Sequence, residues 1–296
     1  MMVTREPSLL TDPSRDRLAR RCSAAPVGPK RKIRRLYFVG FVLFLAISFT
    51  ACERTAGPAK TSGGEILVSA AASLEDACRE IARHFEQRTG VKVVLNFASS
   101  GELEKQIEFG APTDVFAGAG EREMDALADK GLIDAGTRAD FAANTLVLAV
   151  PAVSSAPPLK SFSGLAGASV ERIAIGNPAT VPAGHYAQQS LVNTGLWGKV
   201  QGRLILGENV RQVLEYVAHG EVDAGLVYST DVPIAHGRAK VVTAAPDGTY
   251  GPIRYPIAVV KSSRHAGAAR EFVQFVLGPE GQRVLKQFGF AAVSEK

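Results

Sequence analysis

The chain has 296 residues, enough for two domains of ordinary size, and its 46% hydrophobic and 21% charged residues are typical of a globular protein. A formal charge of +5 spread over the whole chain would indicate a nucleic-acid partner. However, residues 1–51 carry ten Lys and Arg residues against three acids, which leaves the rest of the chain at −2. The basic excess therefore belongs to a leader segment, and we predict no nucleic-acid partner.

Residues 1–51 have the pattern of a secretory signal peptide. A cationic stretch over 30–35 precedes an apolar run over 36–47, and small residues then lead to Cys52. The run is shorter than the roughly 20 residues that a membrane-spanning helix needs. An uncleaved signal anchor and a twin-arginine signal at Arg34-Arg35 are the alternatives. All of them predict a body outside the cytoplasm.

The three cysteines do not form a disulfide framework. Cys22 lies in the leader, and Cys52 ends the small-residue stretch, so that Cys78 alone remains in the body. Cys78 falls on the apolar face of a predicted helix, where we expect a small buried hydrophobic residue. Residues 52–63 are rich in small and polar residues and predict a flexible tether.

From residue 64 onwards, short apolar runs alternate with helical patterns. The first predicted helix covers 73–88, with a capping-box pattern at Ser73 and Asp76 and a stop at Gly90. The strands predicted in this half cover 66–68, 91–97 and 115–117, and its further helices cover 101–109 and 121–130.

A second alternating series follows a strand over 146–150 and a break at Pro157-Pro158. Its strands are predicted over 173–175, 204–206, 224–227 and 257–260, and its helices from about 184 and over 210–218, 271–277 and 281–288. Strands that alternate with helices indicate parallel sheets covered by helices on both faces. The sequence therefore predicts a secreted α/β protein of two lobes.

Serine residues come immediately after two of the predicted strands, and in both places a predicted helix begins there. Ser73 stands in the first of these places and Ser99-Ser100 in the second. A helix N-terminus carries unpaired N–H groups and a partial positive charge. Two such ends facing each other would bind a small anion without any Lys or Arg, whereas plain helix capping is the alternative for each serine.

The second half offers comparable features. Residues 177–184 lead from a strand into a helix, and Asn209 is a good N-cap for the helix that opens at Val210. Tyr228 ends a strand, where its hydroxyl would face a cleft; packing is the alternative role.

Seven motifs occur together in the order and spacing of one protein family. They are Ala71-Ala72-Ser73-Leu74, Phe97-Ala98-Ser99-Ser100, Gly110-Ala111-Pro112-Thr113-Asp114-Val115-Phe116, Val181-Pro182-Ala183-Gly184, Asn209-Val210-Arg211, Gly225-Leu226-Val227-Tyr228 and Tyr255-Pro256-Ile257-Ala258-Val259-Val260. On these motifs the chain resembles the periplasmic molybdate-binding proteins of bacterial ABC importers from Ile66 to Phe290.

This resemblance implies a periplasmic-binding-protein fold of two lobes, each a doubly wound sheet flanked by helices. The chain would cross between the lobes near 144–146 and 254–256, which gives lobe 1 over 64–145 and 256–296 and lobe 2 over 146–255. The ligand would lie in the cleft, and hinge closure would present the form that the importer's membrane permease subunits recognise. We expect a monomer.

The resemblance also implies how the ligand is held, namely as a tetrahedral dianion bound by hydrogen bonds alone. By motif, the donors would be the hydroxyl and N–H groups of Ser73 and Ser100, the backbone N–H groups of Ala183 and Val210, and the hydroxyl of Tyr228. No cofactor is implied, and molybdenum would enter only as the oxyanion, without direct bonds to the protein. The sequence departs from the family at Gly101, where Ser is common, and at Asn177 and Asn209, where Asp is common.

The stretch Phe49-Thr50-Ala51-Cys52 resembles a bacterial lipobox, with Phe49 in place of the usual Leu. It implies that Cys52 is lipidated and anchors the protein to a membrane.

A pocket made only of donors suits a fully deprotonated dianion and disfavours hydrogen phosphate, whose proton would find no acceptor. Molybdate and tungstate both fit this description, and sulfate differs from them in size. Sulfate, another oxyanion and a small organic acid remain the alternative ligands. Arg211 is the one cation in the motifs, and on a helix its side chain should point about 100° away from that of Val210.

The sequence lacks the motifs that would indicate an enzyme. Gly118-Ala119-Gly120 with Asp140 is similar to a dinucleotide-binding fingerprint, but Glu123 replaces the third glycine and would repel a pyrophosphate. The sequence has no G-x-S-x-G elbow and no P-loop, and its five histidines lack metal-site spacing. We therefore predict a binding protein and not an enzyme.

Overall fold

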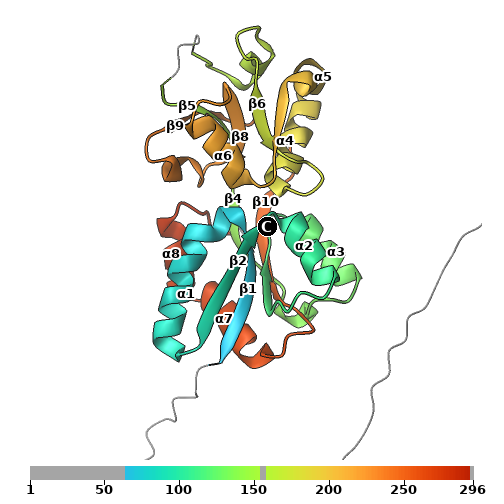
Figure 1. Ribbon diagram of the computed structural model, residues 1–296, viewed down its shortest axis with the longest axis vertical. Helices are drawn as coiled ribbons and strands as arrows, with labels where there is room; N and C mark the ends of the chain where they lie inside the picture. The colour runs from blue at the N-terminus through green and yellow to red at the C-terminus, as the bar shows by residue number, and fades with distance from the viewer. Residues whose placement is uncertain (1–63, 154–157, 294–296) are drawn as a thin grey trace, which may run out of the picture. The chain divides into compact units, whose positions relative to one another are not determined.

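The computed structural model describes residues 64–153 and 158–293 (Figure 1). The predicted signal peptide over 1–51, the proposed lipidation site Cys52 and the tether that follows it lie outside these residues. Within them, no helix combines the length and the apolar character that crossing a membrane requires.

The first of two five-stranded sheets has the strand order β2-β1-β3-β10-β4. Its strands are β1 (Glu65–Ala71), β2 (Lys92–Ala98), β3 (Val115–Ala117), β4 (Ala139–Asn144) and β10 (Ile253–Val259). The helices beside it are α1 (Glu75–Thr89), α2 (Ser100–Glu108), α3 (Glu121–Asp129), α7 (Ala266–Leu277) and α8 (Pro279–Gln287). We call these elements, with the short 3-10 segments η1 (Ala72–Leu74) and η2 (Ala135–Thr137), lobe 1.

The second sheet has the order β7-β6-β8-β5-β9. Its strands are β5 (Leu146–Pro151), β6 (Ile173–Gly176), β7 (Leu204–Gly207), β8 (Ala224–Tyr228) and β9 (Ala239–Ala244). Beside it lie α4 (Pro182–Asn193), α5 (Trp197–Val200) and α6 (Val210–Ala218), with the 3-10 segments η3 (Phe162–Ala166), η4 (Gln201–Arg203) and η5 (Val232–Ala235). These elements form lobe 2.

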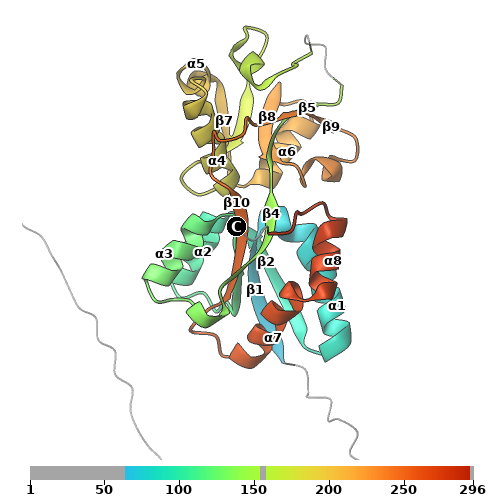
Figure 2. The same cartoon turned by 180° about the vertical axis from the view of Figure 1, so that it is seen from behind.

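The sheets are mixed rather than wholly parallel. β1 pairs in parallel with β2 and β3, and β6 with β7 and β8, as the alternation of strands and helices predicts. β10 and β5 run antiparallel to their neighbours, so the prediction of parallel sheets is wrong for these strands. β4 and β5 follow each other directly but belong to different sheets, and no helix between them turns the chain back. Figure 2 shows β4 and β10 side by side where the chain passes between the lobes.

The apolar faces predicted from helical spacing are buried in the core. On α1, Phe85 is fully buried and packs edge-on against Phe272 and Phe275 of α7, with ring centroids 5.2 and 5.6 Å apart. Burial of a side chain of this size stabilises the fold by about 1.5–3 kcal/mol. Cys78 is buried on the same face, as predicted, and burial raises the pKa of its thiol to about 12.

The helix ends agree with the sequence patterns in three of four places. Gly90 ends α1 with a φ of 75°, and its N–H donates to Glu86 O at 2.8 Å. Asn209 caps α6 by accepting from Gln212 N at 3.0 Å, and Ser99 caps α2. The capping box at Ser73 and Asp76 is wrong, because α1 begins after Leu74 without a side-chain cap and both side chains have partners elsewhere.

Candidate functional site

A small pocket lies between elements of the two lobes. Its volume is ≈ 200 Å³. The residues that line it are Ala71, Ala72, Ser73, Ala98, Ser99, Ser100, Ala119, Val181, Pro182, Ala183, Asn209, Val210 and Tyr228. All five residues predicted to hold the ligand are among them, and no Lys, Arg or His is.

The pocket sits at the carboxyl ends of parallel strands in both sheets. β1, β2, β6 and β7 each lead there into the start of a helical segment. Ser100 is the first residue of α2, Val210 the first of α6 and Ala183 the second of α4. Backbone N–H groups in the first turn of a helix have no partner within that helix, so these three can donate to a ligand. Helix N-termini from both lobes therefore give the pocket a positive potential without a charged side chain.

The Ser100 hydroxyl accepts a hydrogen bond from the protein. Its Oγ accepts a hydrogen bond from Ala119 N at 3.0 Å, and both residues are buried. The helix cap of α2 is the neighbouring Ser99, whose Oγ accepts from Glu102 N. Because the Ser100 Oγ accepts from a backbone N–H, its own hydroxyl proton remains free to donate into the pocket.

Tyr228 reaches across from lobe 2. Its hydroxyl donates to Ala119 O at 3.1 Å, and its backbone N–H donates to Asp231 Oδ2 at 2.9 Å. Burial raises the pKa of the Tyr228 phenol well above its usual value, so the group stays a proton donor. Ala119 thus receives a hydrogen bond from lobe 2 at its carbonyl and gives one to Ser100 from its N–H.

Arg211 does not line the pocket, as its helical position predicts, but it connects the lobes behind it. Its Nη2 lies 2.9 Å from Asp76 Oδ2 of α1, and its Nε lies 3.2 Å from Asp231 Oδ1. These contacts are ionic, because the atoms do not meet hydrogen-bond geometry. Asp231 is fully buried, and this burial raises the pKa of its carboxyl to about 6, although Arg211 acts in the opposite direction.

The lobes also touch on the other side of the pocket. Arg122 of α3 donates to Pro178 O and Ala179 O at 3.3 and 3.1 Å. Gly101 N donates to Thr180 O at 2.9 Å, and a Cβ at Gly101 would lie 2.7 Å from that oxygen. The glycine that departs from the family pattern therefore allows two backbones to approach closely. Contacts on both sides describe a closed arrangement of the lobes.

Several residues around the pocket were not predicted from the sequence. Ala119 presents only backbone groups, and Asn144, Arg122 and Asp231 lie outside the motifs that carry the resemblance. Tyr255 belongs to one of those motifs, but nothing in the sequence gave it a role; in the structure it contacts Ser73.

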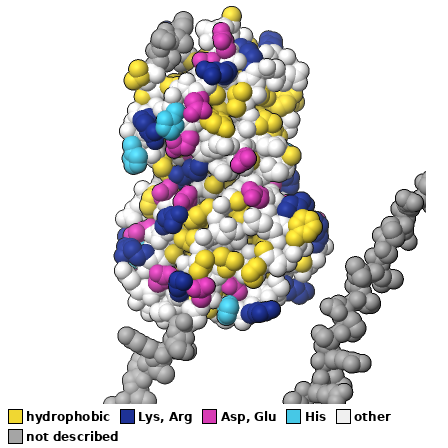
Figure 3. Space-filling model, in the orientation of Figure 1, with side chains coloured by type: hydrophobic (Ala, Val, Ile, Leu, Met, Phe, Trp, Pro, Cys, Tyr) yellow, Lys and Arg dark blue, Asp and Glu magenta, His cyan; other side chains and the backbone are white. Residues whose placement is uncertain are grey.

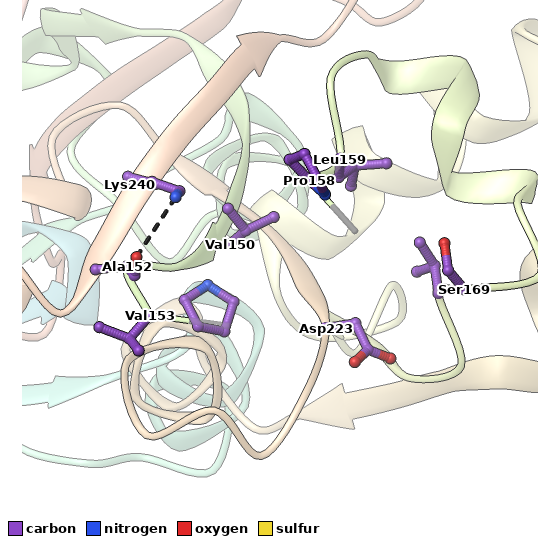
Figure 4. Close-up of a pocket in the computed structure, with 10 residues that line it drawn as sticks. Val150, Ala152, Val153, Pro158, Leu159, Ser169, Asp223 and Lys240 are labelled. Atoms are coloured by element: carbon purple, nitrogen blue, oxygen red, sulfur yellow. Dashed lines mark hydrogen bonds between the residues drawn. The ribbon is translucent and has the colours of Figure 1, made fainter. Parts of the chain in front are cut away.

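A larger pocket in lobe 2 is not the candidate site. It is lined by residues such as Val150, Leu159 and Asp223 and has a volume of ≈ 920 Å³ (Figure 4). Its charged groups already have partners. Lys240 Nζ donates to Ala152 O, and Asp223 Oδ2 accepts from two backbone N–H groups.

Neither the visible face nor the acidic residues of the described chain indicate a second site. Figure 3 shows basic and acidic side chains interspersed over the visible face, without an extended region of one sign. Across residues 64–153 and 158–293, no group of three or more His, Cys, Asp or Glu side chains has an arrangement that could hold a metal ion.

Comparison with known proteins identifies the family. The model of the bacterial extracellular solute-binding proteins matches residues 66–291. Over 228 residues the chain is 40% identical to YvgL of Bacillus subtilis, named provisionally as an ABC transporter substrate-binding lipoprotein; the match covers 77% of this chain and 86% of YvgL. Over 248 residues it is 37% identical to the molybdate-binding protein ModA of Escherichia coli, covering 83% and 94% of the two chains.

A solved structure agrees with these sequence matches. The periplasmic molybdate-binding protein of Azotobacter vinelandii matches with a TM-score of 0.69 and 29% identity, over 77% of this chain and 100% of that one. The fold and the pocket thus define a two-lobed binding protein rather than an enzyme, and the predicted fold class is confirmed. The chain belongs to the bacterial extracellular solute-binding protein family.

Proposed function

We propose that this protein captures molybdate, and also tungstate, outside the cytoplasm and delivers it to an ABC importer. The observation that carries the proposal is the pocket of ≈ 200 Å³, which is lined by hydrogen-bond donors from both lobes and by no cationic side chain. The space enclosed by this pocket is small, so a compact ion suits it better than an organic acid. The names of the relatives in Escherichia coli and Azotobacter vinelandii support the choice of ion.

In this proposal each lobe supplies part of the coordination. Ser73 and Ser100 donate from lobe 1, and the N–H groups of Ala183 and Val210 donate from lobe 2. Tyr228 has a single hydroxyl proton, which is directed to Ala119 O. To donate to the ion, the hydroxyl turns from that carbonyl towards the pocket, so that Tyr228 couples ion binding to the contact between the lobes.

The same proposal gives roles to the two lobes, the leader segment and the tether. The topology supports hinge crossings near 144–146 and 254–256, with lobe 1 over 64–145 and 256–296 and lobe 2 over 146–255. After cleavage of residues 1–51, lipidation of Cys52 would anchor the protein to the membrane through the tether over 52–63, and the name of YvgL supports a lipoprotein. The closed monomer would then dock on the permease subunits of the importer.

The test is calorimetric titration of the mature protein with molybdate, tungstate, sulfate and phosphate in turn. We expect tight one-to-one binding of the first two ions and weak or no binding of the others. Heat from sulfate without heat from molybdate would overturn the ligand and leave the family intact.

The residue assignment is tested separately with Ser73→Ala and Tyr228→Phe. Each substitution removes one hydrogen bond to a charged group and should weaken molybdate binding by about 1.5–3 kcal/mol. Unchanged affinity in both variants would refute the assignment of these donors.

A further inference from the structure

A chain of buried and partly buried side-chain hydrogen bonds ends at Ser73. Asn144, the last residue of β4, donates from Nδ2 to the Tyr255 hydroxyl at 3.2 Å. The Tyr255 hydroxyl lies 3.2 Å from Ser73 Oγ. Tyr255 is fully buried in β10 and does not itself line the pocket.

The direction of this chain is fixed at Asn144. Its Oδ1 accepts from Thr145 N at 2.9 Å, and a backbone N–H can only donate. Ser229 donates to the same oxygen at 2.9 Å. The Nδ2 group therefore faces Thr230 Oγ1, at 2.8 Å, and the Tyr255 hydroxyl, and an amide nitrogen can only donate to them.

Tyr255 continues the same direction of donation. Because its hydroxyl oxygen accepts from Asn144, its proton is directed to Ser73 Oγ, the other partner it has among the described residues. Burial raises the pKa of the Tyr255 phenol, so this proton is retained.

Ser73 consequently accepts from Tyr255 and keeps its own proton for the pocket. We propose that Asn144 and Tyr255 are positioning residues that fix Ser73 as a hydrogen-bond donor and thereby select fully deprotonated dianions over protonated oxyanions. This inference rests on the proposed function. In it, Ser73 directs its proton to the ligand, so the ligand oxygen that faces it must accept, and the proton of hydrogen phosphate is left without a partner.

Ser100 is also fixed as a donor to the pocket, because its Oγ accepts directly from the backbone N–H of Ala119. A backbone donor cannot be reversed by a side-chain substitution. The chain behind Ser73 can be reversed, and this makes the inference testable.

The first experiment removes the middle group of this hydrogen-bond chain, the Tyr255 hydroxyl. Tyr255→Phe removes the donor that fixes the direction of the Ser73 hydroxyl, which can then turn and accept from the ligand instead of donating to it. We expect molybdate affinity to fall about tenfold and phosphate affinity to stay level or rise, so that the ratio between them narrows. Tyr250→Phe is the matched control, because it removes a phenol hydroxyl outside the pocket lining and should leave both affinities unchanged.

The second experiment reverses the direction of donation along these hydrogen bonds. In Asn144→Asp, both side-chain oxygens accept, so the Tyr255 proton turns towards the new carboxylate and Ser73 donates to Tyr255 instead of the pocket. Molybdate affinity should fall about a hundredfold. Thr145→Asp adds the same charge at the adjacent exposed residue and measures the contribution of charge alone.

The double variant gives a readout that a merely structural role would not produce. Combining Asn144→Asp with Tyr255→Phe removes the group that draws the Ser73 proton away, so the double variant should bind molybdate more tightly than Asn144→Asp alone. Additive losses, or a parallel loss for molybdate and phosphate in Tyr255→Phe, would overturn the positioning role.

The wild-type titrations separate this inference from the proposed function. If the wild type binds sulfate and not molybdate, the proposed ligand is wrong, and the same variants titrated with sulfate should show the same reversal and rescue. A wild type that binds none of the four ions overturns both proposals.

Discussion

The two lobes present side-chain and backbone donors to one pocket in different proportions. Lobe 1 contributes the hydroxyls of Ser73 and Ser100, whose oxygens are each held by a protein donor, and the N–H group at the start of α2. Lobe 2 contributes the N–H groups at the starts of α4 and α6, together with the hydroxyl of Tyr228. Side-chain donors depend on the partners behind them for their direction. Backbone donors depend only on where a helix begins, so almost any side chain is compatible with the role.

The groups behind these donors differ as well. Neutral partners stand behind the lobe 1 hydroxyls: Tyr255, Asn144 and the Ala119 N–H. Behind Tyr228 in lobe 2 stands the carboxyl of Asp231, with Arg211 beside it. The titrating group therefore lies on the lobe 2 side of the pocket.

The largest predicted effect tests this contrast through the stability of the protein. Burial raises the Asp231 pKa from 3.8 to about 6, so the stability that this group contributes is present below about pH 3.8 and lost as the pH rises through about 6. Asp231→Asn keeps an acceptor for Tyr228 N and removes the titration. As the pH rises between these values, the free energy of unfolding of the variant should increase relative to that of the wild type, by up to about 3 kcal/mol.

Denaturant unfolding of both proteins from acid to neutral pH measures this difference. Asp129→Asn, at an exposed position of α3, is the control for the loss of one carboxyl charge. A difference between Asp231→Asn and the wild type that stays constant over the pH range would contradict the buried, titrating carboxyl.

The next effect tests the backbone donors. Val210 is the first residue of α6, a position where proline fits a helix, and Asn209 before it is extended, with φ −154° and ψ 171°. Val210→Pro therefore removes the N–H and keeps the helix. We expect molybdate binding to weaken by about 1.5–3 kcal/mol with little change in melting temperature.

Val210→Ala serves as its control, because it shortens the side chain and keeps the N–H. It should bind molybdate nearly as well as the wild type. Equal losses in both variants would assign the effect to packing of the side chain and not to the backbone donor.

Sequence patterns predicted the elements whose signal is local. The strand over 115–117 and the helix over 210–218 have the predicted bounds, because apolar spacing alone decides them. β4 and β9 were not predicted, and β10 begins at Ile253 rather than Ile257. β10 and β4 pair antiparallel across the passage between the lobes, and such pairing depends on contacts distant in sequence.

The candidate site divides in the same way. The two places where serines follow a strand suggested an anion site from local chemistry, whereas Ala183 and Val210 carry no chemical signal and came only from the resemblance. The capping box at Ser73 and Asp76 failed because tertiary partners, Tyr255 and Arg211, took both side chains. Neither partner could be paired with its residue from spacing, since the separations exceed a hundred residues.

The smallest predicted effect concerns a contact that joins the two lobes. Arg211 of lobe 2 and Asp76 of lobe 1 lie 2.9 Å apart, with side chains 17% and 39% exposed. The pair is only partly buried, and pairs near the surface are typically worth about 0.2–1 kcal/mol, so Asp76→Asn should weaken molybdate binding by about fivefold. Because the contact crosses between the lobes, the loss should appear as faster ion release in stopped-flow measurements, and it should shrink at high salt.

Glu75→Gln is the matched comparison for that measurement. It breaks the pair of Glu75 with Arg79, which lies 2.7 Å away on α1 and is also exposed, but within one lobe. An ion pair inside a lobe is kept whether the lobes are open or closed, so its loss should not change the release rate. If both variants release the ion equally fast, the Arg211–Asp76 contact does not hold the lobes together, and closure depends on the pocket itself.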